Sequence, residues 1–302
     1  RSKGLIQIKT NERYLKDLLV RMAHHSTAIE GNTLTQEEVI SILIYNYIPE
    51  EMNKREYYEV KNFKKAFEYI DESLQNNKNI SIEFIKKLHS IIMDNILDNA
   101  GEFKKTENII VGANFVPTKP YLVQIELKEM LDNLEFRLIN SKCIEEKIEA
   151  IISEHIKFEK IHPFSDGNGR IGRLLMMYSC LREEIVPFVI TKEEKNKYIN
   201  LLAQEDISQF KKWILELVKF ELLNNLAKIH TTELGIVRIK RNLSLDIDDV
   251  VEWCKNKISS KNTSITRKGK NWYITVEGCI ITVNAHSFTI ITAHKEKNNK
   301  EI

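Results

Sequence analysis

Along the first 234 residues, apolar side chains recur every three or four positions, the spacing that gathers them on one face of an α-helix. The pattern predicts amphipathic helices in residues 11–30, 55–70, 81–97, 124–139, 148–161 and 210–229. Thr35 is followed three residues later by Glu38, the spacing of a capping box, so another helix is expected after residue 35. With only ten glycines and five prolines, the 302-residue chain has few places to turn. We therefore expect a mainly α-helical fold.

Two parts of the chain depart from the helical pattern. Residues 101–123, GEFKKTENIIVGANFVPTKPYLV, alternate over short runs between Gly and Pro residues, which predicts an exposed β-hairpin or flap. The last long helix is expected to stop near Gly235. A short helix (246–258) and four β-rich runs (263–268, 271–277, 279–284 and 288–293) then predict a small antiparallel meander. We place the domain boundary so that residues 1–240 form a large helical domain and residues 241–302 a small α+β domain.

The composition narrows the class of protein. Hydrophobic residues make up 42% of the chain and charged residues 29%, with a net charge of +2, so no strong basic field points to nucleic acid. The four cysteines form no CxxC pair and are interpreted as buried thiols of a reducing compartment. The N-terminus lacks the apolar core of a signal peptide, and no apolar run is long enough to span a bilayer. We expect a soluble, cytoplasmic protein.

The stretch EKIHPFSDGNGRIGRLL at 159–175 carries the strongest chemical signal. A proline ends one helix there and a second helix begins after the glycines, so the loop lies at a helix N-terminus, which attracts anions. Gly167 and Gly169 let the backbone approach an anion closely. Arg170 and Arg173 are three positions apart on the new helix and can face one ligand. Two guanidiniums at one site indicate a polyphosphate.

Two further residues of this loop suit phosphate chemistry. Beside phosphates, Asp166 makes sense as a Mg²⁺ ligand, because that ion is commonly held by one or two carboxylates and phosphate oxygens. His162 is the residue suited to moving a proton near neutral pH.

Two common motifs offer alternative interpretations of the glycines. GNGRIG at 167–172 matches the dinucleotide fingerprint GxGxxG, but a helix rather than a β-strand precedes it, and βαβ alternation is lacking. The P-loop pattern GxxxxGK[ST] does not occur in the sequence. A purely structural glycine-rich helix start would leave the histidine, the acid and the two arginines clustered without a reason.

The segment HPFSDGNGRIGR at 162–173 resembles the signature of the Fic family, HxFx[D/E]GNGRxxR, at every defined position. The resemblance implies a helical domain that transfers AMP from ATP to a hydroxyl side chain of a target protein. It implies His162 as the general base, Phe164 as the anchor of the loop and Asp166 as the ligand of a Mg²⁺ that bridges the α- and β-phosphates. The implied phosphate ligands are Asn168 with the amides around Gly167 and Gly169 for the α-phosphate, and Arg170 and Arg173 for the β- and γ-phosphates.

Two other regions are assigned by the same resemblance. Residues 101–123 resemble the family's target-docking flap, with Gly101, Glu102, Phe103, Val116 and Pro117 as the candidate docking residues. The family more often has Arg where Lys104 stands, so no role is assigned to that residue. Tyr198 and Leu202 fall where the family lines its adenine pocket, although Tyr198 is equally well explained as a core aromatic.

The segment STAIEGN at 26–32 resembles the family's N-terminal inhibitory motif, [S/T]xxxE[G/N], which defines class II members. Glu30 continues an apolar stripe at the C-terminus of the first helix, where the helix dipole disfavours a negative charge, so it needs a cationic partner. Gly31 is a natural left-handed stop. We expect Glu30 to pair with Arg173, with Ser26 positioning the helix end. A solvated carboxylate at a frayed helix end is the alternative.

The remaining signals are weak. The adjacent His24 and His25 point to different faces, which is poor metal geometry, and His89 and His155 are interpreted as structural residues, with His155 a possible support for the loop. From Cys254 onward, nine Lys or Arg face three Asp or Glu, with aromatic residues between them. Such a surface could bind single-stranded nucleic acid or recruit a target, but a solvated surface over a small aromatic core is the commoner case.

The sequence therefore predicts a protein adenylyltransferase with ATP and Mg²⁺ at its site, inhibited by Glu30 and able to modify itself. Its expected partners are a target protein with a Ser, Thr or Tyr hydroxyl and a possible second copy in a homodimer, with no membrane and no nucleic acid. Transfer of UMP or phosphocholine, removal of AMP, and a non-enzymatic nucleotide-binding module remain the alternatives.

Overall fold

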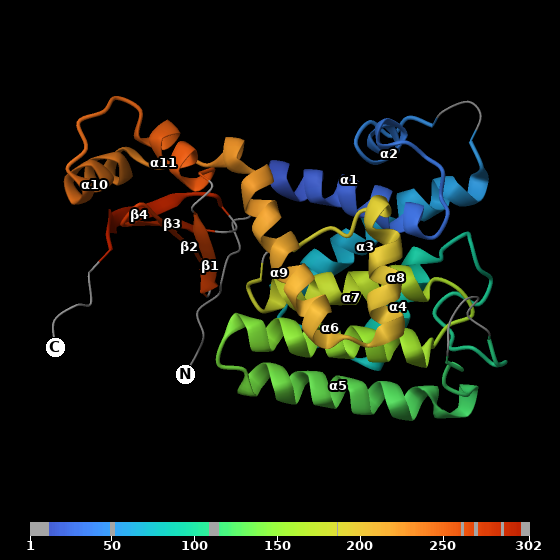
Figure 1. Ribbon diagram of the computed structural model, residues 1–302. Helices are drawn as coiled ribbons and strands as arrows, with labels where there is room; N and C mark the ends of the chain where they lie inside the picture. Colours follow the sequence, from blue (N-terminus) through green and yellow to red (C-terminus); the bar gives the residue numbers. More distant parts are fainter. Residues whose placement is uncertain are drawn as a thin grey trace. The chain divides into compact units, whose positions relative to one another are not determined.

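The computed structural model describes residues 12–48, 52–108, 115–185, 187–260, 263–268, 271–284 and 287–296. The chain divides into two compact units (Figure 1). One holds residues 12–183 and 187–214, and the other is built mainly from residues 215–302.

The larger unit is helical, as the periodicity predicts. Its elements are α1 (Glu12–Ile29), α2 (Gln36–Leu43), α3 (Lys54–Gln75), α4 (Ile82–Ile92), the 3₁₀ turn η1 (Pro120–Leu122), α5 (Val123–Asn140), α6 (Ile144–Ile161), α7 (Asn168–Arg182), the 3₁₀ turn η2 (Lys192–Glu194), α8 (Lys195–Gln204) and the first part of α9 (Ile207–Asn224). The predicted capping box at Thr35 and Glu38 is confirmed at the start of α2. No helix in the described part of the chain is long and apolar enough to cross a membrane.

Helix α7 is the centre of this unit, with α1, α3, α4 and α6 packed around it (Figure 1). All its residues from 170 to 181 are buried, so it presents no solvated face. A helix buried on every side is apolar in most positions, and each polar side chain on it needs a partner from a neighbouring element. The two buried arginines of α7 therefore determine which residues the surrounding helices place against it.

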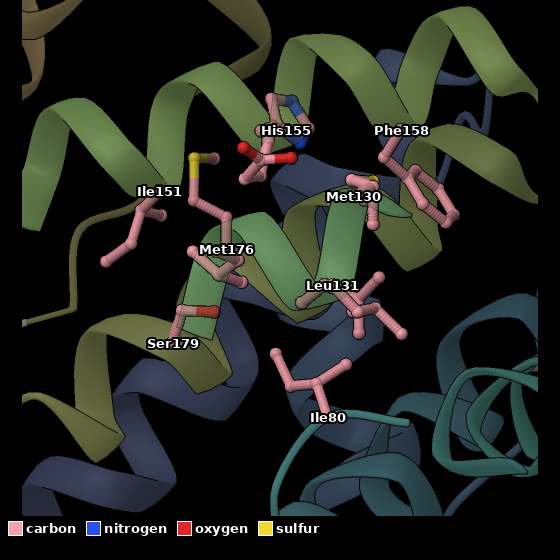
Figure 2. Close-up of a pocket in the computed structure, with 12 residues that line it drawn as sticks. Ile80, Met130, Leu131, Ile151, His155, Phe158, Met176 and Ser179 are labelled. Atoms are coloured by element: carbon pink, nitrogen blue, oxygen red, sulfur yellow. The ribbon is translucent and has the colours of Figure 1, made fainter. Parts of the chain in front are cut away.

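A small cavity lies behind α7, between that helix and α5 and α6. Figure 2 shows its apolar lining, with Met130, Ile151, Phe158 and Met176 around it and His155 among them. Its volume of about 20 Å³ is enough for one water molecule and far too small for a nucleotide. The cavity is therefore an internal feature of the core.

The smaller unit contains an antiparallel meander, as predicted. Its elements are η3 (Leu226–Lys228), α10 (Glu233–Leu243), α11 (Val250–Ile258), β1 (Ser264–Lys268), β2 (Asn271–Val276), β3 (Cys279–Asn284) and β4 (Ile290–Lys295), with the strands in the order β1-β2-β3-β4. In β2, buried Trp272, Ile274 and Val276 alternate with half-buried residues. This alternation gives the sheet one apolar face over a small core.

Helix α10 was not expected from the sequence, because Gly235 was read as a helix stop. Gly235 instead lies in the first turn of α10, where its N–H group donates to the hydroxyl of the N-cap residue Thr232 at 3.1 Å. Asn242 of α10 donates to the carbonyl oxygen of Ala293 in β4, so the helix packs on the sheet. Residue 240 lies inside α10, and the small unit thus begins before the boundary placed there.

The expected hairpin at 101–123 falls partly outside the described residues, which omit 109–114. Its two flanks, 101–108 and 115–119, contain turns and bends and no strand. Backbone hydrogen bonds join them instead to the end of α6 and the loop after it: the Lys104 N–H donates to the Pro163 carbonyl at 2.9 Å and the Thr118 N–H to the Lys160 carbonyl at 3.3 Å.

All four cysteines are free. Cys180, Cys254 and Cys279 are buried as expected, but Cys143 is exposed because it precedes the first turn of α6 at the surface.

Candidate functional site

The loop between α6 and α7 has two left-handed residues. His162 ends α6 with φ 47°, and Gly167 precedes α7 with φ 83°. A Cβ atom on Gly167 would lie 2.7 Å from the sulfur of Met93, so only glycine fits. The Asn168 side chain closes the loop, since it accepts from the Phe164 N–H and donates to the Phe164 carbonyl, both at 2.9 Å. Asn168 therefore shapes the loop with its side chain.

His89, which the sequence suggested was merely structural, holds this loop from α4. Its ring stacks on the buried Phe164 ring with centroids 3.7 Å apart and an interplanar angle of 4°. The Gly101 N–H donates to Nδ1, so Nε2 carries the proton and donates to the Asp166 carbonyl at 3.0 Å. Burial lowers the pKa of His89 to about 4, which keeps this neutral tautomer. His89 thus joins the start of the 101–123 segment to the loop.

His162 is half-buried and oriented as a base. Its Nδ1 lies 3.3 Å from the Glu159 carbonyl oxygen, which can only accept, so the proton is on Nδ1 and Nε2 is the basic atom. Burial lowers the pKa of His162, and the nearby Lys104 ammonium lowers it further, so the ring is neutral near pH 7.

Lys104 is a site residue that the sequence left without a role. It is 4% exposed, and its Nζ donates to the carbonyl oxygen of Ile161, directly before His162, and to the Asn108 side chain. Burial lowers its pKa to about 8. Lys104 therefore fixes the end of α6 from which His162 projects.

The N-terminus of α7 presents unpaired donors. The backbone N–H groups of Asn168, Gly169 and Arg170 donate to no group within the ranges that the structure describes. A Cβ atom on Gly169 would lie 2.4 Å from Glu30 Oε1, so that carboxylate occupies the space above the glycine. A negative group thus already sits where the helix dipole attracts one.

Glu30 and Arg173 form the expected ion pair, with Arg173 Nη2 at 2.7 Å from Glu30 Oε1. Arg173 also donates from Nε to the Ser26 hydroxyl and from Nη2 to the Ser26 carbonyl, both at 2.9 Å. Although burial opposes ionisation, the Arg173 charge holds the pKa of Glu30 below its usual value. Gly31 follows with φ 107°, the left-handed stop predicted for it.

Asp166 and Arg170 belong to a second charge cluster, beside the Glu30–Arg173 pair. Asp166 Oδ1 accepts from Arg170 Nη2 at 3.2 Å, and Asp166 Oδ2 accepts from Arg55 Nη2 at 2.5 Å. Arg170 Nη1 lies 3.1 Å from the buried carboxylate of Glu59. Arg170 and Arg173 thus face different carboxylates, and both guanidiniums are almost fully buried.

An open, polar cleft of about 380 Å³ lies over this second cluster. It is lined by Glu30, Gly31, Asn32, Asn53, Arg55, Glu56, Glu59, Asp166 and Arg170. The Asp166 side chain is 39% exposed toward it, which fits a carboxylate that shares a Mg²⁺ with phosphate oxygens and water.

A second acid near Arg173 is Glu159, a half-buried residue whose Oε1 atom is fully buried. Its Oε1 and the Nδ1 of His155 have no hydrogen-bond partner in the described part of the chain, and a Cβ on Gly172 would lie 2.3 Å and 3.2 Å from them. Burial raises the pKa of Glu159 to about 7, with Arg173 opposing and Glu30 adding to the rise. His155 Nε2 is 2.8 Å from the Tyr198 hydroxyl.

The two residues predicted to line an adenine pocket differ in burial. Tyr198 is 1% exposed, with the Arg173 guanidinium 5.8 Å from its ring centroid, so it is a core residue with no ring surface open to a base. Leu202 is half-buried. In the 101–123 segment Val116 is 80% exposed whereas Pro117 is buried.

Fold and site together define a class: a helical domain whose glycine-containing loop leads into the N-terminus of its buried central helix. The comparisons agree, because residues 79–180 match the Fic/DOC family. The chain contains a Fic domain. Residues 223–294 match a second family, described as a protein of unknown function (DUF3781).

Similar proteins extend the match. The chain is 31% identical to "Protein adenylyltransferase Fic" of Drosophila erecta over 210 residues, which cover 68% of this chain and 41% of the relative. The relative of the same name from Aedes aegypti is 30% identical over 212 residues, with the same coverage. The chain thus spans about two-fifths of the length of these curated relatives.

Solved structures show the same fold. Fic-1 of C. elegans (residues 134–508) aligns with a TM-score of 0.58 and 26% identity over 72% of this chain and 63% of that one. A Fic domain containing signaling protein from Bacteroides thetaiotaomicron aligns with a TM-score of 0.63 and 24% identity over 68% of this chain and 86% of that one.

The raised pKa of Glu159 allows a prediction of how stability depends on pH. A carboxyl whose folded pKa is raised from 4.5 to about 7 costs stability as the pH rises through that window, because the unfolded chain ionises first. Glu159→Gln should therefore raise Tm over wild type at pH 8 and change it little at pH 4.5, with each kcal/mol worth about 2–4 °C. Glu149→Gln on the same helix removes the exposed partner of Lys211 and should give no gain at pH 8. A Tm difference for Glu159→Gln that does not grow with pH would contradict the assignment.

Proposed function

We propose that this chain is a protein adenylyltransferase that moves AMP from ATP to the hydroxyl of a Ser, Thr or Tyr side chain, and that Glu30 inhibits it. The observation that carries the proposal is the 162–173 segment, where, among the described residues, His162 Nε2 and the N–H groups of residues 168–170 have no hydrogen-bond partner. The names of the curated relatives support the same activity.

In this proposal the loop binds ATP through its phosphates. The N–H groups at the start of α7 receive the α-phosphate, while Arg170 and Arg173 bind the β- and γ-phosphates of the leaving pyrophosphate. His162 Nε2 takes the proton of the target hydroxyl as its oxygen bonds to the α-phosphorus and the bond to pyrophosphate breaks. Positioning and charge stabilisation carry most of such a reaction, and the base adds about 10²–10⁴-fold.

Asp166 would hold the metal ion in this scheme. Mg²⁺, when bound, neutralises charge on the α- and β-phosphates. Asp166 contributes an ionised carboxylate at the cleft, since the Arg170 and Arg55 charges lower its pKa although burial opposes them.

Inhibition follows from the place of Glu30. Its carboxylate pairs with the Arg173 guanidinium and fills the space above Gly169. It would therefore take the place of a phosphate group at the proposed nucleotide site. ATP could then bind only in a pose with its α-phosphate displaced, and transfer would come from the minor fraction of molecules in which Glu30 has moved away.

The target would dock beside His162. The flanks of the 101–123 segment are fixed next to it by Lys104 and Thr118, which is where an extended target chain, or a segment of a second copy of this protein, would present its hydroxyl.

His162→Ala should abolish transfer and retain nucleotide binding, since only the base is lost. The measurement is intact mass of the protein and of candidate targets after incubation with ATP and Mg²⁺, with UTP in a parallel reaction. The expected adduct is AMP in the wild type or in Glu30→Gly and none in His162→Ala. Normal transfer by His162→Ala would show that another group is the base, whereas a UMP adduct alone would replace the proposed nucleotide.

Glu30→Gly should activate the protein. If the displaced state of Glu30 is about 1% populated, removing the carboxylate raises the rate of auto-modification by up to roughly 100-fold, because rate follows the competent population. Ser26→Ala should activate less, by loosening the helix end. The double variant Glu30→Gly/Arg173→Ala should lose the gain, because it also removes the phosphate ligand.

Glu37→Ala, at an exposed carboxylate on α2, is the matched control and should behave as wild type. Equal rates in wild type and Glu30→Gly would remove autoinhibition from the proposal and leave Glu30 as a helix-end carboxylate.

A further inference from the structure

Arg55, from outside the 162–173 loop, holds one oxygen of Asp166. It lies 111 positions earlier in the chain, in the first turn of α3, and its Nη2 is 2.5 Å from Asp166 Oδ2. Its backbone is fixed there, because its N–H donates at 2.8 Å to Oδ1 of Asn53, the N-cap of α3. Arg55 belongs to no part of the motif that the sequence singled out.

Glu59 holds Arg55 from its other side. Arg55 Nε is 3.1 Å from Glu59 Oε1, and the same oxygen is 3.1 Å from Arg170 Nη1. The Glu59 side chain is only 8% exposed, so its charge requires these cations. Asp166 therefore lies between two guanidiniums that one buried carboxylate positions.

The guanidiniums of Arg170 and Arg55 differ in how easily they could move away from Asp166. The Arg170 side chain is 1% exposed and cannot move into water without opening the core. The Arg55 side chain is 53% exposed, and its α-carbon lies at a helix start on the rim of the cleft. A second cation that reaches Asp166 Oδ2 repels both guanidiniums, and of the two only Arg55 is exposed enough to turn into solvent.

We propose that Arg55 is a resident counter-cation of Asp166, which a divalent metal ion must displace when it binds with the nucleotide. The inference rests on the proposed function in one respect, the use of Asp166 as the metal ligand. It assigns to Arg55 a competitive role: the guanidinium holds Asp166 ionised and in place without metal, and lowers the affinity of the site for metal.

The size of the effect follows from exposure. An ion pair in which both partners are partly exposed contributes little, and its loss corresponds to about a two- to fivefold change in an equilibrium constant. Removing Arg55 should therefore tighten metal binding by about that factor. If Arg55 instead bound the nucleotide, removing it would weaken binding.

The test variant is Arg55→Met, which keeps an unbranched side chain and removes the charge. Glu59 is unsuitable for this purpose, because its Oε2 also accepts from the Asn32 side chain at 3.0 Å and so helps to hold the segment that carries Glu30. Lys54→Met is the matched control: it removes one positive charge from the neighbouring position, and Lys54 forms no ion pair in the described ranges.

The probe is Mn²⁺ added to the full chain with an ATP analogue that has a methylene between its α- and β-phosphates. The signal of free Mn²⁺ in electron paramagnetic resonance gives the metal Kd with no need for transfer. Arg55→Met should lower the Kd about two- to fivefold, Lys54→Met should leave it unchanged, and Arg55→Lys should return it toward wild type. Analogue binding in EDTA should stay within about twofold in Arg55→Met.

Three results overturn the inference, and they are distinguishable. If Asp166→Asn weakens Mn²⁺ binding but Arg55→Met does not tighten it, the displacement role is wrong and the proposed metal ligand stands. If Asp166→Asn and wild type bind Mn²⁺ equally, the metal does not use Asp166, and both the inference and that part of the proposed function fail. Weaker analogue binding by Arg55→Met in EDTA would instead make Arg55 a phosphate ligand, which also overturns the inference.

Discussion

The structure depends on the burial of a guanidinium in the middle of a helical domain. Arg173 lies on the fully buried helix α7 with 4% of its surface exposed, and an arginine does not lose its proton there. Such a charge is tolerated only when anions and hydrogen-bond acceptors surround it. Ser26 of α1 and Glu30, which directly follows that helix, supply them, so the N-terminal helix is attached to the domain at Arg173. The contacts that satisfy the buried Arg173 charge are thus the same contacts that place Glu30 over the start of α7.

The same requirement shapes the rest of the loop. Glu59 of α3 is the buried counter-charge of Arg170, and Glu30, partly exposed at the end of α1, is the counter-charge of Arg173. Just before these two arginines, the loop passes through the left-handed residues His162 and Gly167. The Asn168 amide and the His89 ring hold this loop by hydrogen bonds to its backbone. Asp166 is thereby left at the cleft, and His162 at the end of α6.

Much of this could be read from the sequence, and the limits have a physical cause. Helical periodicity and the capping box at Thr35 are local, and the 162–173 motif is contiguous, so the helices and the loop residues were predictable. Arg55 and His89 were not, because their partners lie far away in the chain and their own surroundings look like ordinary helix starts and ends. Gly235 misled because glycine marks both helix ends and crowded positions, and here Thr231 leaves no room for a side chain. Tyr198 was ambiguous until its burial was known.

Gly31 gives the contact between Glu30 and Arg173 a property that evolution or engineering could adjust. Its backbone is left-handed at φ 107°, yet nothing lies within 4 Å of where its Cβ would be. Any other residue would therefore fit in space and be strained only in conformation, by about 1–3 kcal/mol. A strain of that size, relieved when the chain beyond α1 relaxes, changes a two-state population by about one to two powers of ten. Single substitutions at Gly31, on the lining of the cleft, should therefore shift how often the Glu30–Arg173 ion pair is formed.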